Sequence, residues 1–211
     1  MRGLTPSTDL AGSLTETLQA AAAHERLVFL CSFQKEESVI LDELLEIAGG
    51  WGRIHVVTID TGVLFEETLA TWRAFEARFG MTIEVEEAFG TPPWTGPEHC
   101  CGSQKVAALN RALAGADAWI TGLRREQGPT RAGTNLVEVD EKRGGIAKYN
   151  PLARWTERDL WARIAERDLP YHPLHDDGYA SIGCAPCTLP GDGRSGRWAG
   201  TSKSECGLHV A

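Results

Sequence analysis

Residues 27–40 read LVFLCSFQKEESVI and give the clearest indication of the fold. Residues 27–31 are apolar, as in a short buried strand. Residues 32–38 form a polar loop, and apolar residues then recur at helical spacing until Gly49-Gly50 ends the pattern. This stretch therefore predicts a strand, a polar turn and a helix in direct succession.

The alternation of strand and helix continues along the chain. We expect helices at 9–23, 39–47, 66–79, 103–114 and 157–166, strands at 27–31, 54–59, 82–85 and 118–121, and a hairpin or short strands within 136–149. This order predicts an α/β fold with a mostly parallel sheet and helices on both faces. Ligands of such folds bind beyond the carboxyl ends of the strands. The loops 32–38, 60–62 and 122–131 are therefore expected to converge on one site.

Composition and charge exclude some classes of function. The 211 residues are 42% hydrophobic and 24% charged, which is ordinary for a globular protein. The net charge of −8 disfavours a nucleic-acid partner, and no apolar run is long enough to span a membrane. Residues 1–18 lack the basic start and apolar stretch of a signal peptide. We therefore expect a cytoplasmic protein with no membrane association.

Four of the six cysteines form a set with metal-ligand character. Cys100-Cys101 and Cys184-x-x-Cys187 can offer four thiolates to one centre. Adjacent ligands fit poorly around a single tetrahedral zinc ion, so the spacing favours an iron–sulfur cluster over zinc. The alternative is that these are simply buried core cysteines, which is the interpretation we give to Cys31.

The C-terminal region carries a further cysteine. Residues 190–211 are rich in glycine and serine, so we expect a mobile tail attached to an α/β domain at 1–189. Cys206 is either a nucleophile in this tail or a spare cysteine. Lys203 and His209 would favour its thiolate, whereas Glu205 would oppose it.

Basic side chains supply candidate anion ligands against the overall acidic charge. Arg124, Arg125 and Arg131 share one loop, and Arg194 and Arg197 repeat the pattern in the tail. Arginine binds phosphate and sulfate through paired hydrogen bonds. The alternative is a solvated loop of salt bridges. The loop 32–38 has the position of a phosphate loop but not the Walker A sequence, and Asp60-Thr61-Gly62 is a weak signal alone.

Seven motifs together resemble a known family. They are Ser32-Phe33-Gln34, Asp60-Thr61-Gly62, Cys100-Cys101-x-x-x-Lys105, Gly122-Leu123-Arg124-Arg125, Cys184-x-x-Cys187-Thr188, Arg194-x-Gly196-Arg197-Trp198 and Glu205-Cys206-Gly207-Leu208-His209. In this order they resemble the assimilatory adenylyl-sulfate (APS) reductases, thioredoxin-dependent enzymes of sulfate assimilation and cysteine biosynthesis. The sequence departs from these enzymes at Val63, where relatives often carry a basic residue, and in a shorter stretch between 188 and 194.

The resemblance implies a fold, a cofactor and a reaction. The fold would be an adenine-nucleotide-hydrolase-like sheet related to PP-loop enzymes. A 4Fe–4S cluster would bind Cys100, Cys101, Cys184 and Cys187. Adenosine 5′-phosphosulfate (APS) and reduced thioredoxin, or a glutaredoxin-like donor, would give sulfite and AMP through an S-sulfocysteine.

The resemblance also implies roles for individual residues. The catalytic residues would be Cys206, His209 and Lys105. Substrate would bind Ser32, Phe33, Gln34, Thr61, Gly62, Arg124, Arg125, Arg194 and Arg197. Reduction of PAPS, the 3′-phosphorylated substrate, or of both nucleotides stays an alternative, although the cluster cysteines favour APS. A PP-loop tRNA-thiolating enzyme and a zinc-stabilised binding module are further alternatives. The sequence leaves the oligomeric state open, a homo-oligomer included.

Overall fold

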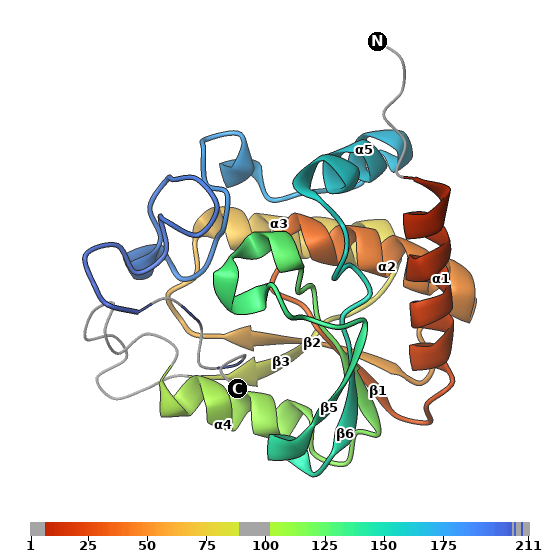
Figure 1. Cartoon of the computed structure of the whole chain (residues 1–211). Coiled ribbons are helices and arrows are strands. Elements are labelled where there is room, and N and C mark those ends of the chain that lie inside the picture. Colours follow the sequence, from red (N-terminus) through yellow and green to blue (C-terminus); the bar gives the residue numbers. More distant parts are fainter. Residues whose placement is uncertain (1–6, 89–101, 204, 206–207, 209–211) are drawn as a thin grey trace.

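The fold is built on one sheet, which Figure 1 shows in a computed structural model that describes residues 7–88, 102–203, 205 and 208. The strands are β1 (Leu27–Leu30), β2 (Ile54–Asp60), β3 (Glu84–Glu87), β4 (Ala118–Ile120), β5 (Val137–Asp140) and β6 (Ile146–Tyr149). Their order is β3-β2-β1-β4-β6-β5. Adjacent strands are parallel except at the edge, where β5 pairs antiparallel with β6. The predicted mostly parallel sheet is confirmed, and so is the hairpin within 136–149.

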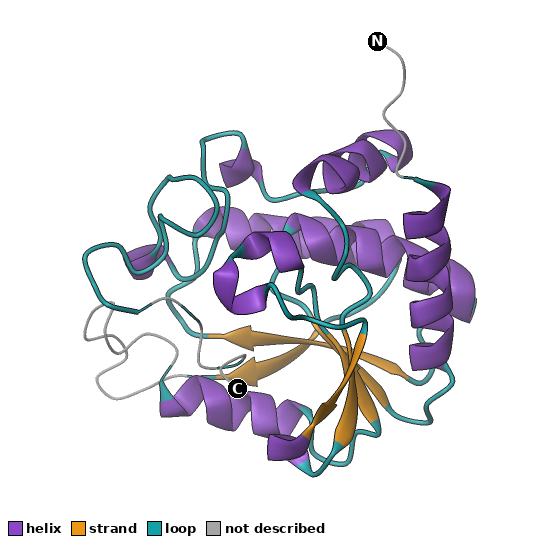
Figure 2. Ribbon diagram, in the orientation of Figure 1, coloured by secondary structure: helices purple, strands orange, loops and turns teal. Residues whose placement is uncertain are grey.

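Helices cover both faces of this sheet, as Figure 2 shows. They are α1 (Thr8–Ala22), α2 (Lys35–Ala48), α3 (Glu66–Phe79), α4 (Ser103–Ala112) and α5 (Glu157–Arg167). α4 lies on one side of the sheet, and α1, α2, α3 and α5 lie on the other (Figure 1). None of the helices in the described part of the chain is long and apolar enough to cross a membrane.

The strands divide their side chains between two cores. Leu27 and Phe29 of β1 pack with α1, α2, α3 and α5, whereas Val28 and Leu30 pack with α4. This alternation follows from the twofold side-chain period of a strand. It explains why β1 is a continuous apolar run, because both of its faces are covered.

Local sequence sets where the helices begin and end. Thr156 caps α5 through a reciprocal pair: its hydroxyl accepts from the Asp159 amide at 3.2 Å, and the Asp159 carboxylate accepts from the Thr156 amide at 2.9 Å. Gly49 ends α2 in the left-handed conformation, with φ of 64°. Both of these boundaries agree with the sequence patterns to within a residue. The start of α2 does not, because the helix begins at Lys35, inside the stretch 32–38 that was predicted to be a loop.

The third strand is shifted from its predicted position. β3 begins at Glu84, whereas the prediction placed it at 82–85. Ile83 is buried beneath α3, and its amide donates to the Glu76 carboxylate at 2.9 Å instead of joining the sheet. A tertiary hydrogen bond therefore sets this boundary. The helix predicted at 103–114 likewise ends earlier, at Ala112.

The described part of the C-terminal segment packs against the α4 side of the sheet. Trp198 is only 1% exposed and clusters with Cys184, Cys187 and Leu208. Its amide donates to the Cys187 carbonyl at 2.9 Å. The Trp198 ring is therefore part of the core. Mobility of residues 190–211 stays a prediction.

Candidate active site

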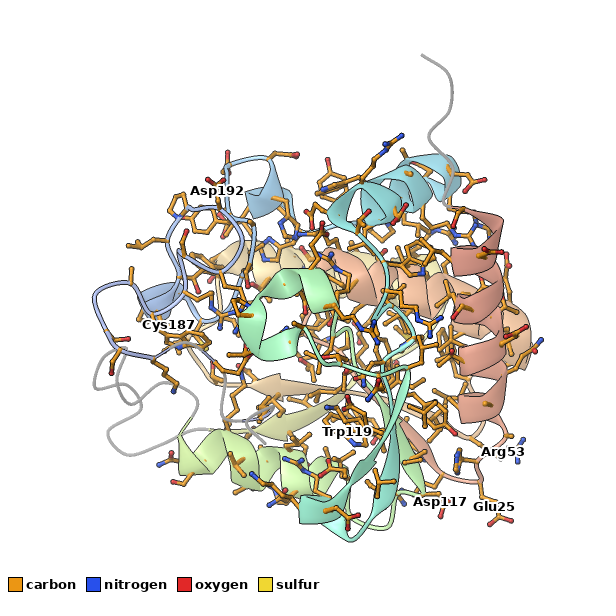
Figure 3. The ribbon with its side chains drawn as sticks, in the orientation of Figure 1. Glu25, Arg53, Asp117, Trp119, Cys187 and Asp192 are labelled. Carbon is orange, nitrogen blue, oxygen red and sulfur yellow. The ribbon has the colours of Figure 1, made fainter. Side chains whose placement is uncertain are left out.

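A pocket of about 490 Å³ lies at the carboxyl ends of the central strands. Its wall comes from β1 and the loop after it, the end of β2, the loop after β4, residues 180–184 and the C-terminal segment. This is the size of a site for a small organic ligand. Cys187 and Asp192 lie at this end of the sheet, and Glu25, Arg53 and Asp117 at the opposite end (Figure 3).

Two of the three loops expected to converge line this pocket directly. The third, residues 60–62, lies just behind its wall. Asp60 accepts the Gly62 amide at 2.8 Å in a tight turn. The Thr61 hydroxyl lies 3.1 Å from the Cys184 sulfur, and Cys184 is itself part of the lining. Thr61 therefore supports the wall instead of forming it.

The loop that precedes α2 is shaped by its own side chains. Phe33 has a φ of 62°, a left-handed conformation that is unusual for a bulky residue. Its ring leaves the pocket and stacks on Trp72 of α3, with ring centroids 5.4 Å apart. Gln34 accepts the Ile182 amide at 3.0 Å and so joins this loop to the segment 180–184. Phe33 thus lines the pocket, and its ring anchors the loop to α3.

Glu37 is a buried carboxyl in the pocket wall. It accepts the Gln34 amide at 2.6 Å and the Ser32 hydroxyl at 3.2 Å. Burial, reinforced by the neighbouring charge of Glu36, raises the pKa of Glu37 to about 8. This side of the pocket therefore carries less negative charge at neutral pH than its sequence suggests.

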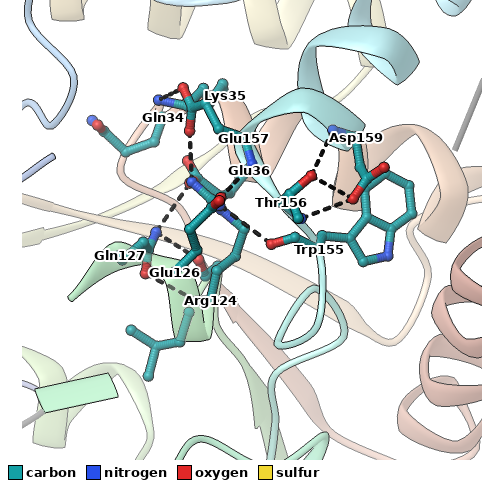
Figure 4. A network of polar contacts seen from close by, with 12 residues as sticks. Gln34, Lys35, Glu36, Arg124, Glu126, Gln127, Trp155, Thr156, Glu157 and Asp159 are labelled. Atoms are coloured by element: carbon teal, nitrogen blue, oxygen red, sulfur yellow. Dashed lines mark hydrogen bonds and ion pairs between the residues drawn. The ribbon is translucent and has the colours of Figure 1, made fainter. Parts of the chain in front are cut away.

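Arg124 is buried at the centre of an ion network, which Figure 4 shows. It donates to Glu36 at 2.8 Å, to Glu126 at 2.9 Å and to Glu157 at 2.7 Å. Lys35 adds a second cation 3.0 Å from Glu157. Burial alone would raise the pKa of Glu36, but these two cations hold it below its ordinary value. Arg124 therefore joins α2, the loop after β4 and α5.

The other predicted arginines lie in three different settings. Arg125 is exposed, donates to the Thr134 carbonyl at 2.7 Å and does not line the pocket. Arg194 lines the pocket and donates to Glu205 at 2.8 Å. Arg197 also lines it and donates to the Ile182 carbonyl at 3.2 Å.

Gly183 makes room for Arg197. A Cβ atom at this position would lie 2.3 Å from the Arg197 guanidinium nitrogen Nη2. The absence of a side chain therefore allows the arginine to pass close to the backbone of the segment 180–184. Arg197 Nε is buried and has no hydrogen-bond partner among the residues that the structure describes. A buried unsatisfied donor beside a pocket is a favourable place for an anionic ligand atom.

The Cys-x-x-Cys motif forms one side of the site. Cys184 and Cys187 are each 3% exposed and are joined by a 3₁₀ turn at Ala185–Cys187. The Ala185 amide donates to the Val63 carbonyl at 2.9 Å, which ties this turn to the loop after β2. Val63, the departure noted in the sequence, thus contributes a backbone contact here.

The remaining predicted residues divide into two groups. Lys105, in the first turn of α4, lines the pocket as expected. Cys100, Cys101, Cys206 and His209 lie outside the described residues. Among the described residues there is no group of three or more side chains that could hold a metal ion. Two of the four proposed cluster cysteines, Cys100 and Cys101, are not among the residues searched.

Sequence reasoning did not assign several residues of the site. Glu37 was expected in the polar loop 32–38 and Glu157 at the start of a helix, with no role in the site for either. Glu37 is buried in the pocket wall, and Glu157 bridges Arg124 and Lys35. Arg131 was a candidate anion ligand but was not among the substrate-binding residues that the resemblance implied, and it lines the pocket. The three arginines in one loop were the available signal for it. The sequence contains no comparable signal for Glu37 and Glu157, because the residues that they contact in the site are not apparent from local sequence.

These features define an α/β protein with a mostly parallel sheet and a pocket for a small ligand at its carboxyl edge. The chain belongs to the phosphoadenosine phosphosulfate reductase family, whose domain matches residues 26–190. The predicted fold class and the resemblance stated above are therefore confirmed.

Three known proteins illustrate this relationship. The phosphoadenosine 5′-phosphosulfate reductase of Gloeobacter violaceus is 45% identical over 88% of this chain and 83% of its own length. The adenosine 5′-phosphosulfate reductase of Bacillus pumilus is 42% identical over 95% of this chain and 92% of its own. The solved phosphoadenylyl-sulfate reductase of Candida auris, a phosphate complex, is 26% identical with a TM-score of 0.68, covering 89% of this chain and all of that one.

Proposed function

We propose that this protein reduces adenosine 5′-phosphosulfate to sulfite and AMP in sulfate assimilation. The observation that carries the proposal is one pocket, in a chain of this family, lined by Lys105, Arg194, Arg197 and the Cys184 thiol. The cations suit a doubly anionic nucleotide, and the cysteine wall lies beside them. A small pocket at the carboxyl edge of a parallel sheet suits a nucleotide.

The reaction needs positive charge, because a thiolate must approach an anionic sulfonyl group. In our proposal Lys105 and Arg197 face the phosphosulfate and screen that repulsion. The loop before α2 and the Gln34–Ile182 contact hold the nucleotide end of the pocket. Arg124 is engaged by three carboxylates, so we assign it to the frame of the site.

The covalent step uses Cys206 as the nucleophile. Its thiolate attacks the sulfur of APS, a sulfur–sulfur bond forms, and the bond from sulfur to the phosphate oxygen breaks to release AMP. A thiolate of reduced thioredoxin, or of a glutaredoxin-like donor, then attacks the Cys206 sulfur and expels sulfite. The second donor thiol reduces the mixed disulfide, so the donor dithiol supplies both electrons. His209 would favour the reactive thiolate.

The described residues fit a 4Fe–4S cluster. Cys184 and Cys187 are both buried in one apolar cluster that also contains residues of α4. Cys100-Cys101 immediately precede the N-terminal residues of that helix in the sequence. We propose these four cysteines as the ligands. When bound, the cluster would supply fixed charge and hold the two segments together.

A matched pair of variants tests the cluster. We expect protein prepared without oxygen to hold iron and sulfide and to absorb broadly in the visible range. Cys187→Ala should lose that iron. Cys31→Ala should retain it, because Cys31 lies in the hydrophobic core directly after β1. Iron retained in Cys187→Ala, or a stoichiometric amount of zinc in the native protein, would contradict the assignment.

The second candidate substrate is PAPS. The relative from Gloeobacter violaceus carries that substrate's name, whereas the relative from Bacillus pumilus is named for APS. Sulfite release with reduced thioredoxin, measured with each nucleotide, separates the two. We expect kcat/KM to favour APS; equal values would indicate dual specificity, and no sulfite from either nucleotide would contradict the proposal.

A reducing cytoplasm, where such a dithiol donor is maintained, is the compartment we propose.

A further inference from the structure

Glu205 is clamped by two arginines from the pocket wall. Arg131 donates to it as a fork, from Nε to Oε2 at 2.9 Å and from Nη2 to Oε1 at 2.7 Å. Arg194 adds a third bond to Oε1 at 2.8 Å, and the Thr130 hydroxyl a fourth to Oε2 at 3.2 Å. Two arginines thus share the Glu205 carboxylate.

The clamp is largely removed from solvent. The side chains of Glu205, Arg131 and Arg194 are 11%, 8% and 15% exposed. Forked arginine–carboxylate bonds are directional and stronger than neutral hydrogen bonds, and screening by water is weak at this burial. The contact is therefore more than a surface ion pair.

The arginine side of the clamp is held in place from behind. Arg131 also donates from Nη1 to Gln127, and Gln127 donates to Glu36 at 3.0 Å. Glu36 is bound to Arg124 in the ion network described above. A continuous chain of hydrogen bonds thus connects Glu205 to α2. The body of the protein, and not the C-terminal segment, therefore sets the place where Arg131 binds Glu205.

The next described residue beyond Glu205 is anchored as well. Leu208 is 7% exposed, lines the pocket and packs with Trp198. Glu205 and Leu208 flank Cys206-Gly207 in the sequence. The described residues on both sides of the proposed nucleophile are therefore fixed at the same pocket, one by charge and the other by burial.

We propose that Glu205 is a positioning residue for the reaction of Cys206, and that its clamp by Arg131 and Arg194 docks the C-terminal segment at the pocket. This inference rests on the proposed function, because it assumes that Cys206 attacks the bound nucleotide. It gives Arg194 a role in docking the tail, in addition to any contact with substrate. It also gives Arg131 a function that the sequence motifs did not indicate.

The test compares Glu205→Gln with Glu205→Asp and a matched control. Glutamine keeps the shape but turns an amide donor toward the arginines, whereas aspartate keeps the charge. Glu25→Gln removes the same charge from an exposed turn at the opposite end of the molecule (Figure 3). Three quantities are measured: the single-turnover rate at which Cys206 gains an SO₃ group from APS, the Kd for AMP, and hydrogen exchange of the Trp198 and Thr201 amides.

We expect Glu205→Gln to slow adduct formation about tenfold or more, because the loss of one charge-assisted hydrogen bond has an effect of this size. AMP should bind at least as tightly as in the wild type, because the pocket keeps its arginines. Exchange of the two amides should be faster, since the tail is released. Glu205→Asp should give an intermediate rate, and Glu25→Gln should match the wild type.

Several results would overturn the inference. Adduct formation at the wild-type rate in Glu205→Gln would show that the clamp does not position Cys206. Loss of AMP affinity in parallel with rate would show that Glu205 only preserves the pocket. If the wild type itself gains no SO₃, the proposed function fails; unchanged amide exchange in Glu205→Gln would then reject the docking contact independently.

Discussion

Glu37 is a buried carboxyl whose folded-state pKa, about 8, lies above its ordinary value of 4.5. Between these values the folded protein holds a proton that the unfolded chain has released. The stability that this group contributes is therefore complete below about pH 4.5 and is lost as pH rises through about 8. The free energy of unfolding should therefore fall between these two pH values by the amount that the protonated Glu37 contributes.

Glu37→Gln tests this pH dependence. Glutamine keeps the acceptor for the Gln34 amide and stays neutral at every pH. The free energy of unfolding of the variant, relative to wild type, should rise from pH 5 to pH 8, by on the order of 1–3 kcal/mol. Urea unfolding across that range measures it. Parallel pH profiles in the two proteins would contradict a neutral Glu37, and Glu25→Gln should follow the wild type.

Arg124 and Arg125 are adjacent in sequence but differ in what they do. Arg124 is bound by carboxylates from three segments, whereas Arg125 is exposed and makes one bond to a carbonyl. Arg124→Gln should leave Glu36 buried without its main partner, at a cost of about 3–5 kcal/mol. Arg125→Gln should cost less than about 0.5 kcal/mol. Urea unfolding of both variants measures this difference, and equal losses would show that the network does not support the fold.

From the sequence, Arg124 and Arg125 had the same expected role, that of substrate-binding cations. Their different roles depend on Glu36 and Glu157, which lie 88 and 33 residues from Arg124. Nothing in the local sequence indicates which arginine faces the body of the protein. A charge in a ligand loop can be recognised from sequence, but its ionic partners require the fold.

At the scale of elements, Gly183 fixes the course of Arg197 along the segment 180–184. In Gly183→Ala the added methyl group meets the guanidinium, a flexible group that can move away. We therefore expect a folded protein, destabilised by less than about 1 kcal/mol, with weaker nucleotide binding. Calorimetric titration with AMP should show a Kd raised about tenfold.

The matched control is Gly133→Ala, where an added Cβ meets nothing within 4 Å. Its AMP affinity should equal that of the wild type. An unchanged Kd in Gly183→Ala would indicate that Arg197 does not contact the nucleotide. A loss of folding would mean that the segment cannot adjust, and Arg197→Gln would then measure the contact without changing the backbone.

The elements themselves were largely predictable. The strand at 27–31 and the helix after it follow from hydrophobic spacing and from Gly49, which are local signals. The boundary of β3 was not predictable, because the Ile83 amide bonds to a side chain of α3. Thr61 and Gly62 were expected in the pocket, and the structure places Thr61 behind its wall at Cys184. Local patterns located the loops, whereas packing determined which residues face the ligand.

At the scale of the whole molecule, parallel topology brings the chemistry to one edge. β1, β2 and β4 end at the same side, so loops far apart in sequence meet there. The C-terminal segment returns to this edge and packs on the α4 side (Figure 1). A chain of net charge −8 thereby brings Lys105, Arg194 and Arg197 to one pocket.

The measurement that tests this account most directly is the intact mass of the protein after anaerobic incubation with APS, without thioredoxin. We predict a gain of one SO₃ group in the wild type and none in Cys206→Ala, with AMP released in equal amount. The same incubation with PAPS should give less adduct. Protein that holds its iron yet gains no mass from either nucleotide would contradict the covalent mechanism, and a gain that persists in Cys206→Ala would place the nucleophile elsewhere.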